Sequence, residues 1–304
     1  SGIYQQRAST PGEMGLVTMP WANVGKMKSW GIDGHIAYTQ PFNENTYLTL
    51  RANFTQSKNK ILEFEEAIMR YPYQSAVGYQ SGINRGLIAL GLFKDEADIT
   101  NSPRQTFEST VLPGDIKYKD LNGDGVIDDY DKCLIGQGDV PKIYYGFGAD
   151  LQLGDFSVGA LFAGNAKADR CLGGNAMYPF NDGSGITNLF ANITDRWSAD
   201  NPTNQDVFYP RLHHGNNANQ NNMKTSTWWQ KDVSFLRLKQ LTIAYQLPKK
   251  LINQTFLKSA RIYVMGTNLL TFSKFKLWDP ELNTNNGTAY PNVRTYSVGV
   301  NVSF

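Results

Sequence analysis

The stretch Thr295-Tyr-Ser-Val-Gly-Val-Asn-Val-Ser-Phe304 alternates strictly between apolar residues and polar or small ones. Successive side chains of a β-strand point to opposite faces of the sheet, so a period of two gives one apolar and one polar face. The end of this chain is therefore predicted to be a β-strand that separates an apolar environment from a polar one.

Six further segments repeat this rhythm. Two of them carry apolar residues at every second position, namely Trp30, Ile32, Ile36 and Tyr38, then Leu48, Leu50, Ala52 and Phe54. The other four cover residues 143–153, 156–165, 233–247 and 260–272. Each is about ten residues long, the length that a tilted strand needs to cross a bilayer. A soluble β-sandwich also alternates, so the pattern by itself leaves both architectures open.

The connections between these segments separate the two architectures. Read backwards from Phe304, long and short links alternate, and they cover residues 273–293, 248–259, 166–232, 154–155, 58–142 and 40–45. Tight periplasmic turns and extended external loops produce this alternation in outer-membrane barrels. We therefore predict an all-β, membrane-spanning antiparallel barrel portion of seven strands, with Ser1 on the external side and the chain end on the periplasmic side. Its unpaired edges require further strands, because a bilayer does not tolerate them.

Composition excludes several classes of function. The net charge is +2 and only 18% of the residues are charged, which argues against a nucleic-acid partner. The chain has three His, no Gly-x-Ser-x-Gly motif and no local His/Ser/Asp grouping, so we do not expect an enzyme. With neither an initiating Met nor a signal peptide, the sequence is expected to be a piece of a longer or processed protein.

The segment Asp120-Leu-Asn-Gly-Asp-Gly-Val-Ile-Asp-Asp-Tyr-Asp131 has the spacing of an EF-hand-type calcium loop. Its predicted ligands are Asp120, Asn122, Asp124, the Val126 carbonyl, Asp128 and Asp131, with Gly125 at the sharp turn. Position twelve usually carries a bidentate Glu, and the shorter Asp131 predicts a weaker site. The alternative is a surface turn rich in Asp, Asn and Gly that holds no ion.

Several motifs together resemble the C-terminal part of SusC/RagA-like TonB-dependent transporters. They include the stretch from Gly91 through the predicted calcium loop to Gly136, Pro141-Lys-Ile-Tyr-Tyr-Gly-Phe147, Phe235-Leu-Arg-Leu-Lys-Gln-Leu-Thr242, Gly266-Thr-Asn-Leu-Leu-Thr-Phe272 and the closing strand. The match covers most of the chain from about Trp30 onward, in the order of the family.

This resemblance implies that the whole chain is the C-terminal part of a twenty-two-stranded outer-membrane barrel. Residues 58–142 would form a long extracellular excursion that contains the predicted calcium loop, with a short helix over 62–69. The resemblance further implies a plug domain before Ser1, a SusD-like surface lipoprotein as a lid, and TonB-driven import of oligosaccharides or peptides. The runner-up interpretation is a soluble or surface calcium-dependent glycan-binding β domain without transport.

Other candidate residues follow from the barrel interpretation. Opposite the apolar rows, the side chains expected to face the lumen include Asp33, His35, Arg51, Asn53, Asp150 and Gln152. They fit either plain polar filling of the barrel or a plug and cargo path, and Arg51 could pair with Asp33 or Asp150. The loop aromatic residues that fit either loop packing or contact with cargo or lid are Trp197, Phe208, Tyr209, Trp278 and Tyr290.

Two further features concern the loops. Trp228 and Trp229, just above a strand, are expected in an aromatic girdle at the membrane boundary. Cys133 and Cys171 both fall above the external end of the 143–165 hairpin, where a disulfide and two separate buried thiols are equally compatible with the sequence.

Overall fold

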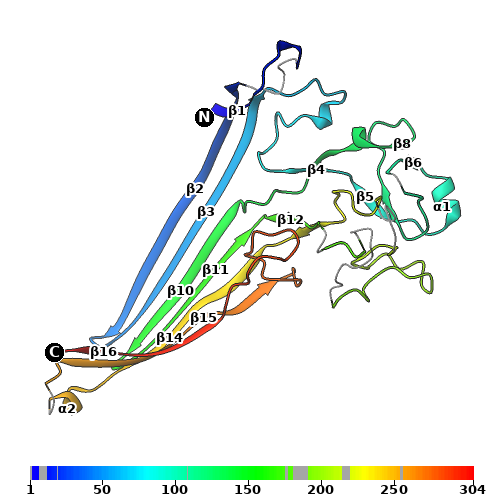
Figure 1. Cartoon of the computed structure of the whole chain (residues 1–304). Helices are drawn as coiled ribbons and strands as arrows, with labels where there is room; N and C mark the ends of the chain where they lie inside the picture. The colour runs from blue at the N-terminus through cyan, green and yellow to red at the C-terminus, as the bar shows by residue number, and fades with distance from the viewer. Residues whose placement is uncertain are drawn as a thin grey trace.

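The computed structural model describes residues 2–6, 12–18, 20–107, 109–174, 177–180, 191–213, 220–253 and 256–304. Its main feature is one eight-stranded antiparallel sheet in the order β1-β2-β3-β10-β11-β14-β15-β16 (Figure 1). The strands are β1 (Gly2–Gln6), β2 (Trp21–Asn43), β3 (Thr46–Phe64), β10 (Ile143–Leu153), β11 (Phe156–Ala166), β14 (Phe235–Gln246), β15 (Ser259–Ser273) and β16 (Thr295–Ser303).

The links between neighbouring strands differ at the two ends of the sheet. At one end the turns are short, including the two-residue Gly154-Asp155 turn, where Gly154 has φ +58°. At the other end the chain makes its long excursions (Figure 1). β1 lies at the long-loop end and Phe304 at the short-turn end, which agrees with the alternation predicted from the sequence (Figure 1).

The sheet has one strand more than the seven predicted, and two of its strands are longer than the predicted ten or so residues. The short β1 pairs with β2 from Gly2↔Lys26 to Gln6↔Trp21. β2 has 23 residues and β3 has 19, so both extend beyond β10 (Figure 1). The helix predicted over 62–69 is wrong, because β3 runs to Phe64 and no helix follows before 70. Pairing of Glu63 and Phe64 with β2, and the hydrogen bond from Glu65 N–H to Val24 O at 2.8 Å, override the local helical tendency.

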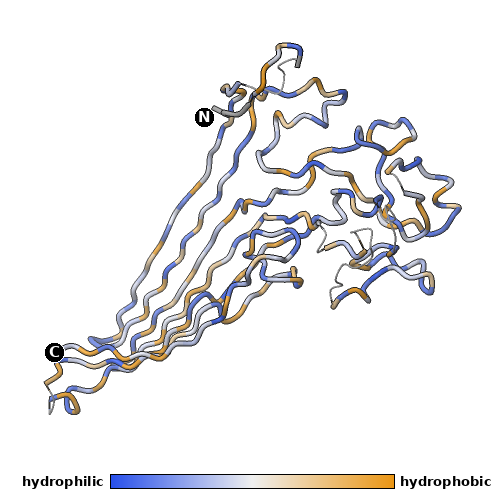
Figure 2. Tube along the Cα trace, in the orientation of Figure 1, coloured by the Kyte–Doolittle hydropathy of each residue, from blue (hydrophilic) through white to orange (hydrophobic). Residues whose placement is uncertain are grey.

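The apolar rows of the sheet are not covered by a second layer among the described residues. Ile36 is 68% exposed and Val298 76%, and the alternation of apolar and polar positions is visible along the strands (Figure 2). A sandwich would bury these side chains, so the self-contained β domain of the runner-up interpretation does not describe this fold. No helix among the described residues is long and apolar enough to cross a membrane.

The buried core lies in the long loops rather than against the sheet. Its short elements are β4 (Asn84–Gly86), β5 (Ala89–Leu92), β6 (Arg104–Gln105), β7 (Ile116–Tyr118), β8 (Val126–Ile127), β9 (Cys133–Ile135), β12 (Asp169–Cys171), β13 (Gln230–Asp232) and α1 (Glu96–Thr100). The remaining helical pieces are α2 (Lys249–Ile252) and the 3-10 turns η1 (Gly12–Met14), η2 (Pro72–Gln74) and η3 (Asp129–Asp131). The elements from β4 to β9, with β12, β13 and α1, belong to the cluster beyond the upper end of β10–β15, whereas α2 lies at the short-turn end (Figure 1).

Candidate functional site: a loop assembly and a polar sheet face

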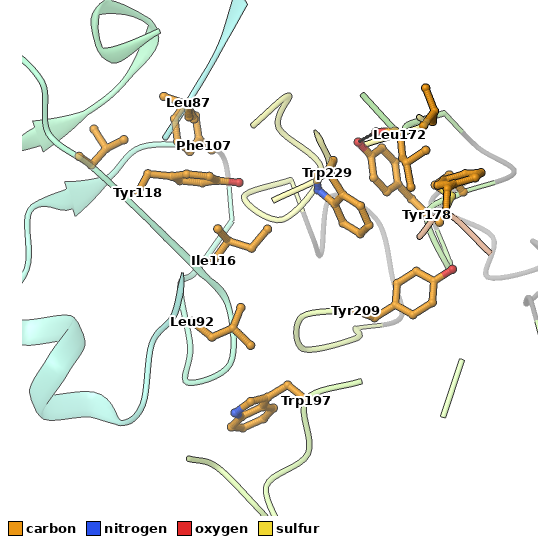
Figure 3. Close-up of a cluster of buried hydrophobic side chains, with 14 of the residues drawn as sticks. Leu87, Leu92, Phe107, Ile116, Tyr118, Leu172, Tyr178, Trp197, Tyr209 and Trp229 are labelled. Carbon is orange, nitrogen blue, oxygen red and sulfur yellow. Dashed lines mark hydrogen bonds between the residues drawn. The ribbon is translucent and has the colours of Figure 1, made fainter. Parts of the chain in front are cut away.

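The loop assembly is held together by an aromatic core. The ring of Trp229, 1% exposed, lies 5.1 Å from that of Tyr178, and its Nε1–H donates to Asn222 O at 2.7 Å. Leu87, Ile116 and other side chains of the same core come from the 58–142 and 166–232 loops, here called the two long loops (Figure 3). The prediction that Trp228 and Trp229 belong to a membrane girdle is wrong for Trp229, because a fully buried ring that donates to a loop carbonyl cannot face lipid.

The other predicted loop aromatics divide between core and surface. Trp197 and Tyr209 are buried, and Phe208 and Trp278 pack half-buried against the same core. Tyr290, in the loop before β16, is 83% exposed. Packing within the loops therefore occupies four of these side chains, and Tyr290 alone of the five is mostly exposed.

Buried amides connect the two long loops. Asn221 Nδ2 donates to Ile116 O at 2.9 Å, and Asn222 Oδ1 accepts from Ile116 N–H at 2.8 Å. Gln105 Nε2 donates to Asn221 Oδ1 at 2.6 Å. Sequence reasoning missed these residues, because partners more than a hundred positions apart leave no spacing signal.

The predicted calcium loop is a series of Asx turns. Asp120 accepts from Gly123 N–H at 2.6 Å and from Gly125 N–H at 2.9 Å, and these two glycines have φ of +75° and +81°. Asn122 Oδ1 accepts from Asp124 N–H at 2.9 Å, and Asp124 Oδ1 from Val126 N–H at 2.9 Å. The first three side chains of the predicted ligand set are therefore turned inward onto their own loop.

Asp131 closes the loop from a fully buried position. Its Oδ1 accepts from Leu121 N–H at 2.7 Å and its Oδ2 from Asp128 N–H at 2.9 Å. Among the described residues, no three His, Cys, Asp or Glu side chains converge as a metal cluster. The oxygen-rich side chains suit a hard cation in kind.

The predicted lumen residues share one face of the sheet. The register pairs Asp33 with Thr55 and His35 with Asn53, and Thr55 Oγ1 donates to Asp33 at 2.6 Å. Of the two partners left open for Arg51, the structure shows Asp150, at 2.9 Å. Near the short turns this face carries a hollow of about 520 Å³, whose polar lining includes Asp150, Gln152, Ser157, Thr242, Gln246 and Arg261.

A second hollow of about 450 Å³ lies on the long-loop side, lined by residues that include Asp139, Tyr144, Asn165, Arg170, Lys239 and Glu281. Asn165 and Arg170 are 8% and 6% exposed. Asn165 Oδ1 and Arg170 Nε have no hydrogen-bond partner among the described residues. Both residues line the hollow, but these two atoms are themselves buried, and the sequence did not indicate either residue.

Cys133 and Cys171 are free thiols in this structure, on β9 and β12. Burial raises the pKa of both thiols. Of the two alternatives that the sequence left open, the structure has two separate, partly buried thiols.

An antiparallel sheet with one exposed apolar face, one ion-paired polar face, short turns at one end and long loops at the other defines a wall segment of a transmembrane β-barrel. No family model matches the sequence. The sequence is 29% identical over 308 residues to TonB-dependent receptor P3 of Formosa agariphila, which covers 93% of this chain and 29% of that protein. It is 28% identical over 311 residues to TonB-dependent receptor P26 of the same organism, covering 93% and 30%.

Solved structures share the fold. The RagAB peptide transporter matches with a TM-score of 0.72 and 24% identity, over 98% of this chain and 32% of that one. The open-open state of the RagAB peptide importer matches with a TM-score of 0.75 and 24% identity, over 100% and 31%. The chain thus spans less than a third of the length of these relatives. Over most of its length it is similar to TonB-dependent receptors, and it shares the fold of the corresponding part of the RagAB structures.

Proposed function

We propose that this chain forms part of the wall of an outer-membrane transporter that imports oligosaccharides or peptides by TonB-dependent transport. The observation that carries the proposal is the division of the sheet into two faces. Val298 is 76% exposed on the apolar face, whereas Arg51 and Asp150 form an ion pair on the other. In this arrangement lipid contacts the apolar face, and a hydrated or plug-filled lumen contacts the polar face. The edge strands β1 and β16 then pair with further strands of the same barrel.

The partners follow from the two ends of the sheet. A SusD-like lipoprotein would cover the long-loop end, where the exposed Tyr290 ring is available for contact. TonB would act through the plug domain. The RagAB structures belong to a peptide transporter, which supports peptides as cargo.

We further propose that the Asp120–Asp131 loop binds calcium and stiffens the extracellular loop assembly. Its ligand spacing supports this, as does its attachment to the core through β8, which pairs in parallel with β6 and buries Ile127 completely. Extracellular calcium is abundant enough to occupy a modest site of this kind.

The test uses the full-length protein in its native membrane. Samples boiled and left unboiled before electrophoresis should differ in mobility, and sequencing of co-purifying bands should identify a surface lipoprotein. Labelled peptides and labelled oligosaccharides are then supplied to cells with an intact or a collapsed proton gradient. Uptake of one cargo class that depends on the gradient is expected. A soluble protein without heat-modifiable mobility, or uptake that ignores the gradient, overturns the proposal.

A further inference from the structure

The apolar face of the β2–β3 hairpin changes character along its length. Close to its short turn, this face of β3 carries Leu48, Leu50, Ala52 and Phe54 at every second position. Farther along it carries Lys58 and Lys60, and the facing strand β2 carries Lys28 and Lys26. We call Lys26, Lys28, Lys58 and Lys60 the outer lysine patch.

The strand register places these lysines on one face. Lys28 is directly opposite Lys60, and Trp30 is opposite Lys58, so each pair projects from the same side of the sheet. Lys28 Nζ lies 5.9 Å from the centroid of the Trp30 ring. The patch therefore shares its face with the exposed apolar rows.

The opposite face of the same segment is occupied by the loops. Asn59 Oδ1 accepts from Ser81 N–H at 2.8 Å, and Ile61 is 8% exposed. Lys58 and Lys60, which alternate with these residues, are exposed. The loop assembly thus contacts the inner face of β3 and its free edge at Ile61, and Lys58 and Lys60 remain exposed.

The height of the patch matches a membrane boundary. Lys58 lies twelve positions beyond Thr46 at the start of β3. At about 3.3 Å per residue and a tilt of about 45°, this corresponds to about 28 Å above the short turns, just past an apolar band of about 25 Å. Trp30, 47% exposed and paired with Lys58, is then at the level where aromatic side chains meet headgroups.

The charge of the patch is largely uncompensated within the part of the chain that the structure describes. Lys26 pairs with Glu63 at 3.0 Å, and none of the other three lysines has a carboxylate partner there. The opposed Lys28 and Lys60 repel each other, as like charges facing across two strands do. An anion that bridges the strands from outside removes this repulsion.

We propose that the outer lysine patch binds the phosphate groups of a phosphorylated, acylated lipid in the outer leaflet. The proposal rests on the membrane placement given under Proposed function. A hollow of about 490 Å³ lies farther down the same face, lined by residues that include Ile36, Tyr38, Leu50, Phe147, Ala149 and Phe162. Ala52 of this hollow is opposite Ile36 and Phe147 and lies six residues from Lys58 along β3. This separation corresponds to about 14 Å in height, so an acyl chain of a lipid bound at the patch can reach the hollow.

The experiment measures lipid binding to the full-length protein in detergent by native mass spectrometry. The probes are a bisphosphorylated, acylated disaccharide and the same lipid without phosphate. The variant Lys26→Gln/Lys28→Gln/Lys58→Gln/Lys60→Gln is compared with the charge-matched control Lys249→Gln/Lys250→Gln/Lys274→Gln/Lys276→Gln, whose four lysines are also exposed. A version with Arg at the four patch positions retains the charge.

The native protein should prefer the phosphorylated probe by about tenfold or more, since lysines near an anionic lipid surface each add to the attraction. The Gln patch variant should lose this preference, and the control and Arg variants should keep it. If the Gln variant fails to assemble, Lys28→Gln/Lys60→Gln replaces it, with a smaller loss expected.

Equal preference in the native protein and the patch variant overturns the proposal. So does displacement of the lipid by millimolar inorganic phosphate, because the patch would then be a site for free phosphate. Heat-modifiable mobility distinguishes failure of this inference from failure of the proposed function. A barrel that is heat-modifiable yet shows no phosphate preference defeats this inference alone, whereas loss of heat modification in the native protein defeats the proposed function.

Discussion

Arg211 and Asp115, 96 positions apart, form a bidentate ion pair between the two long loops. Arg211 Nε lies 2.9 Å from Asp115 Oδ1, and Nη2 lies 3.0 Å from Oδ2. Asp115 is 1% exposed and also accepts from Leu112 N–H at 2.9 Å and Asn222 Nδ2 at 2.8 Å. A fork-to-fork bond fixes both distance and orientation, so this pair sets how the two loops meet.

Removing the carboxylate should loosen the loop assembly and leave the sheet intact. Asp115→Ala leaves the Arg211 guanidinium, whose side chain is 14% exposed, without its buried carboxylate partner, and breaking a buried pair costs about 3–5 kcal/mol. Hydrogen exchange should become faster in peptides within 87–107, 109–118, 205–213 and 220–230 but not in β10 or β11. The control, Glu63→Gln, removes an exposed pair worth about 1 kcal/mol or less. Unchanged exchange in Asp115→Ala would contradict the role assigned to the pair.

Calcium should protect the Asp120–Asp131 loop from proteolysis. Asp124→Asn removes the charge of an exposed proposed ligand and should weaken calcium binding about tenfold, measured by titration calorimetry. Asp129→Asn is the matched control, because Asp129 is exposed, occupies a non-ligand position and pairs only with Lys132 among the described residues. If residues 115–135 resist protease equally in calcium and in EDTA, the calcium proposal is wrong.

Both cysteines should be slow to react in the folded protein. Burial raises the pKa of the Cys133 and Cys171 thiols, so less reactive thiolate is present at any pH below that pKa, and the reaction should accelerate as pH rises. Mass spectrometry after denaturation without reductant should show two alkylation events in this chain. Alkylation that appears only after reduction would establish a disulfide instead.

Gly114 should not tolerate a side chain. Its φ is +87°, and an added Cβ would collide with the ring of the buried Trp197. Gly114→Ala should therefore cost about 1–3 kcal/mol for overpacking in addition to the backbone strain, detected by thermal unfolding followed through tryptophan fluorescence. Gly123→Ala isolates the backbone contribution, because Gly123 also has a positive φ but no atom within 4 Å of the added Cβ. Equal losses in the two variants would rule out the steric contact.

Local rules explain which predictions succeeded. Alternation in 295–304 and the Gly154-Asp155 turn act between neighbouring residues, so strand positions and the short hairpin were predictable. The helix predicted over 62–69 was wrong because the Glu-rich sequence favours a helix locally, whereas pairing with β2 makes the first part of this segment a strand. The prediction that Trp229 lies in a membrane girdle was wrong because nearness to a strand in the sequence does not determine which residues cover the ring.

The sequence by itself determined an all-β chain with one apolar and one polar face, the order of short and long links, and the residues that share each face. These properties follow from a period of two and from turn chemistry, which need no distant partner. The tertiary structure alone decided the Arg211–Asp115 pair, the burial of Trp229 and the alignment of Lys28 with Lys60. Such contacts join residues tens of positions apart or more, and register and loop packing create them only when the whole chain has folded.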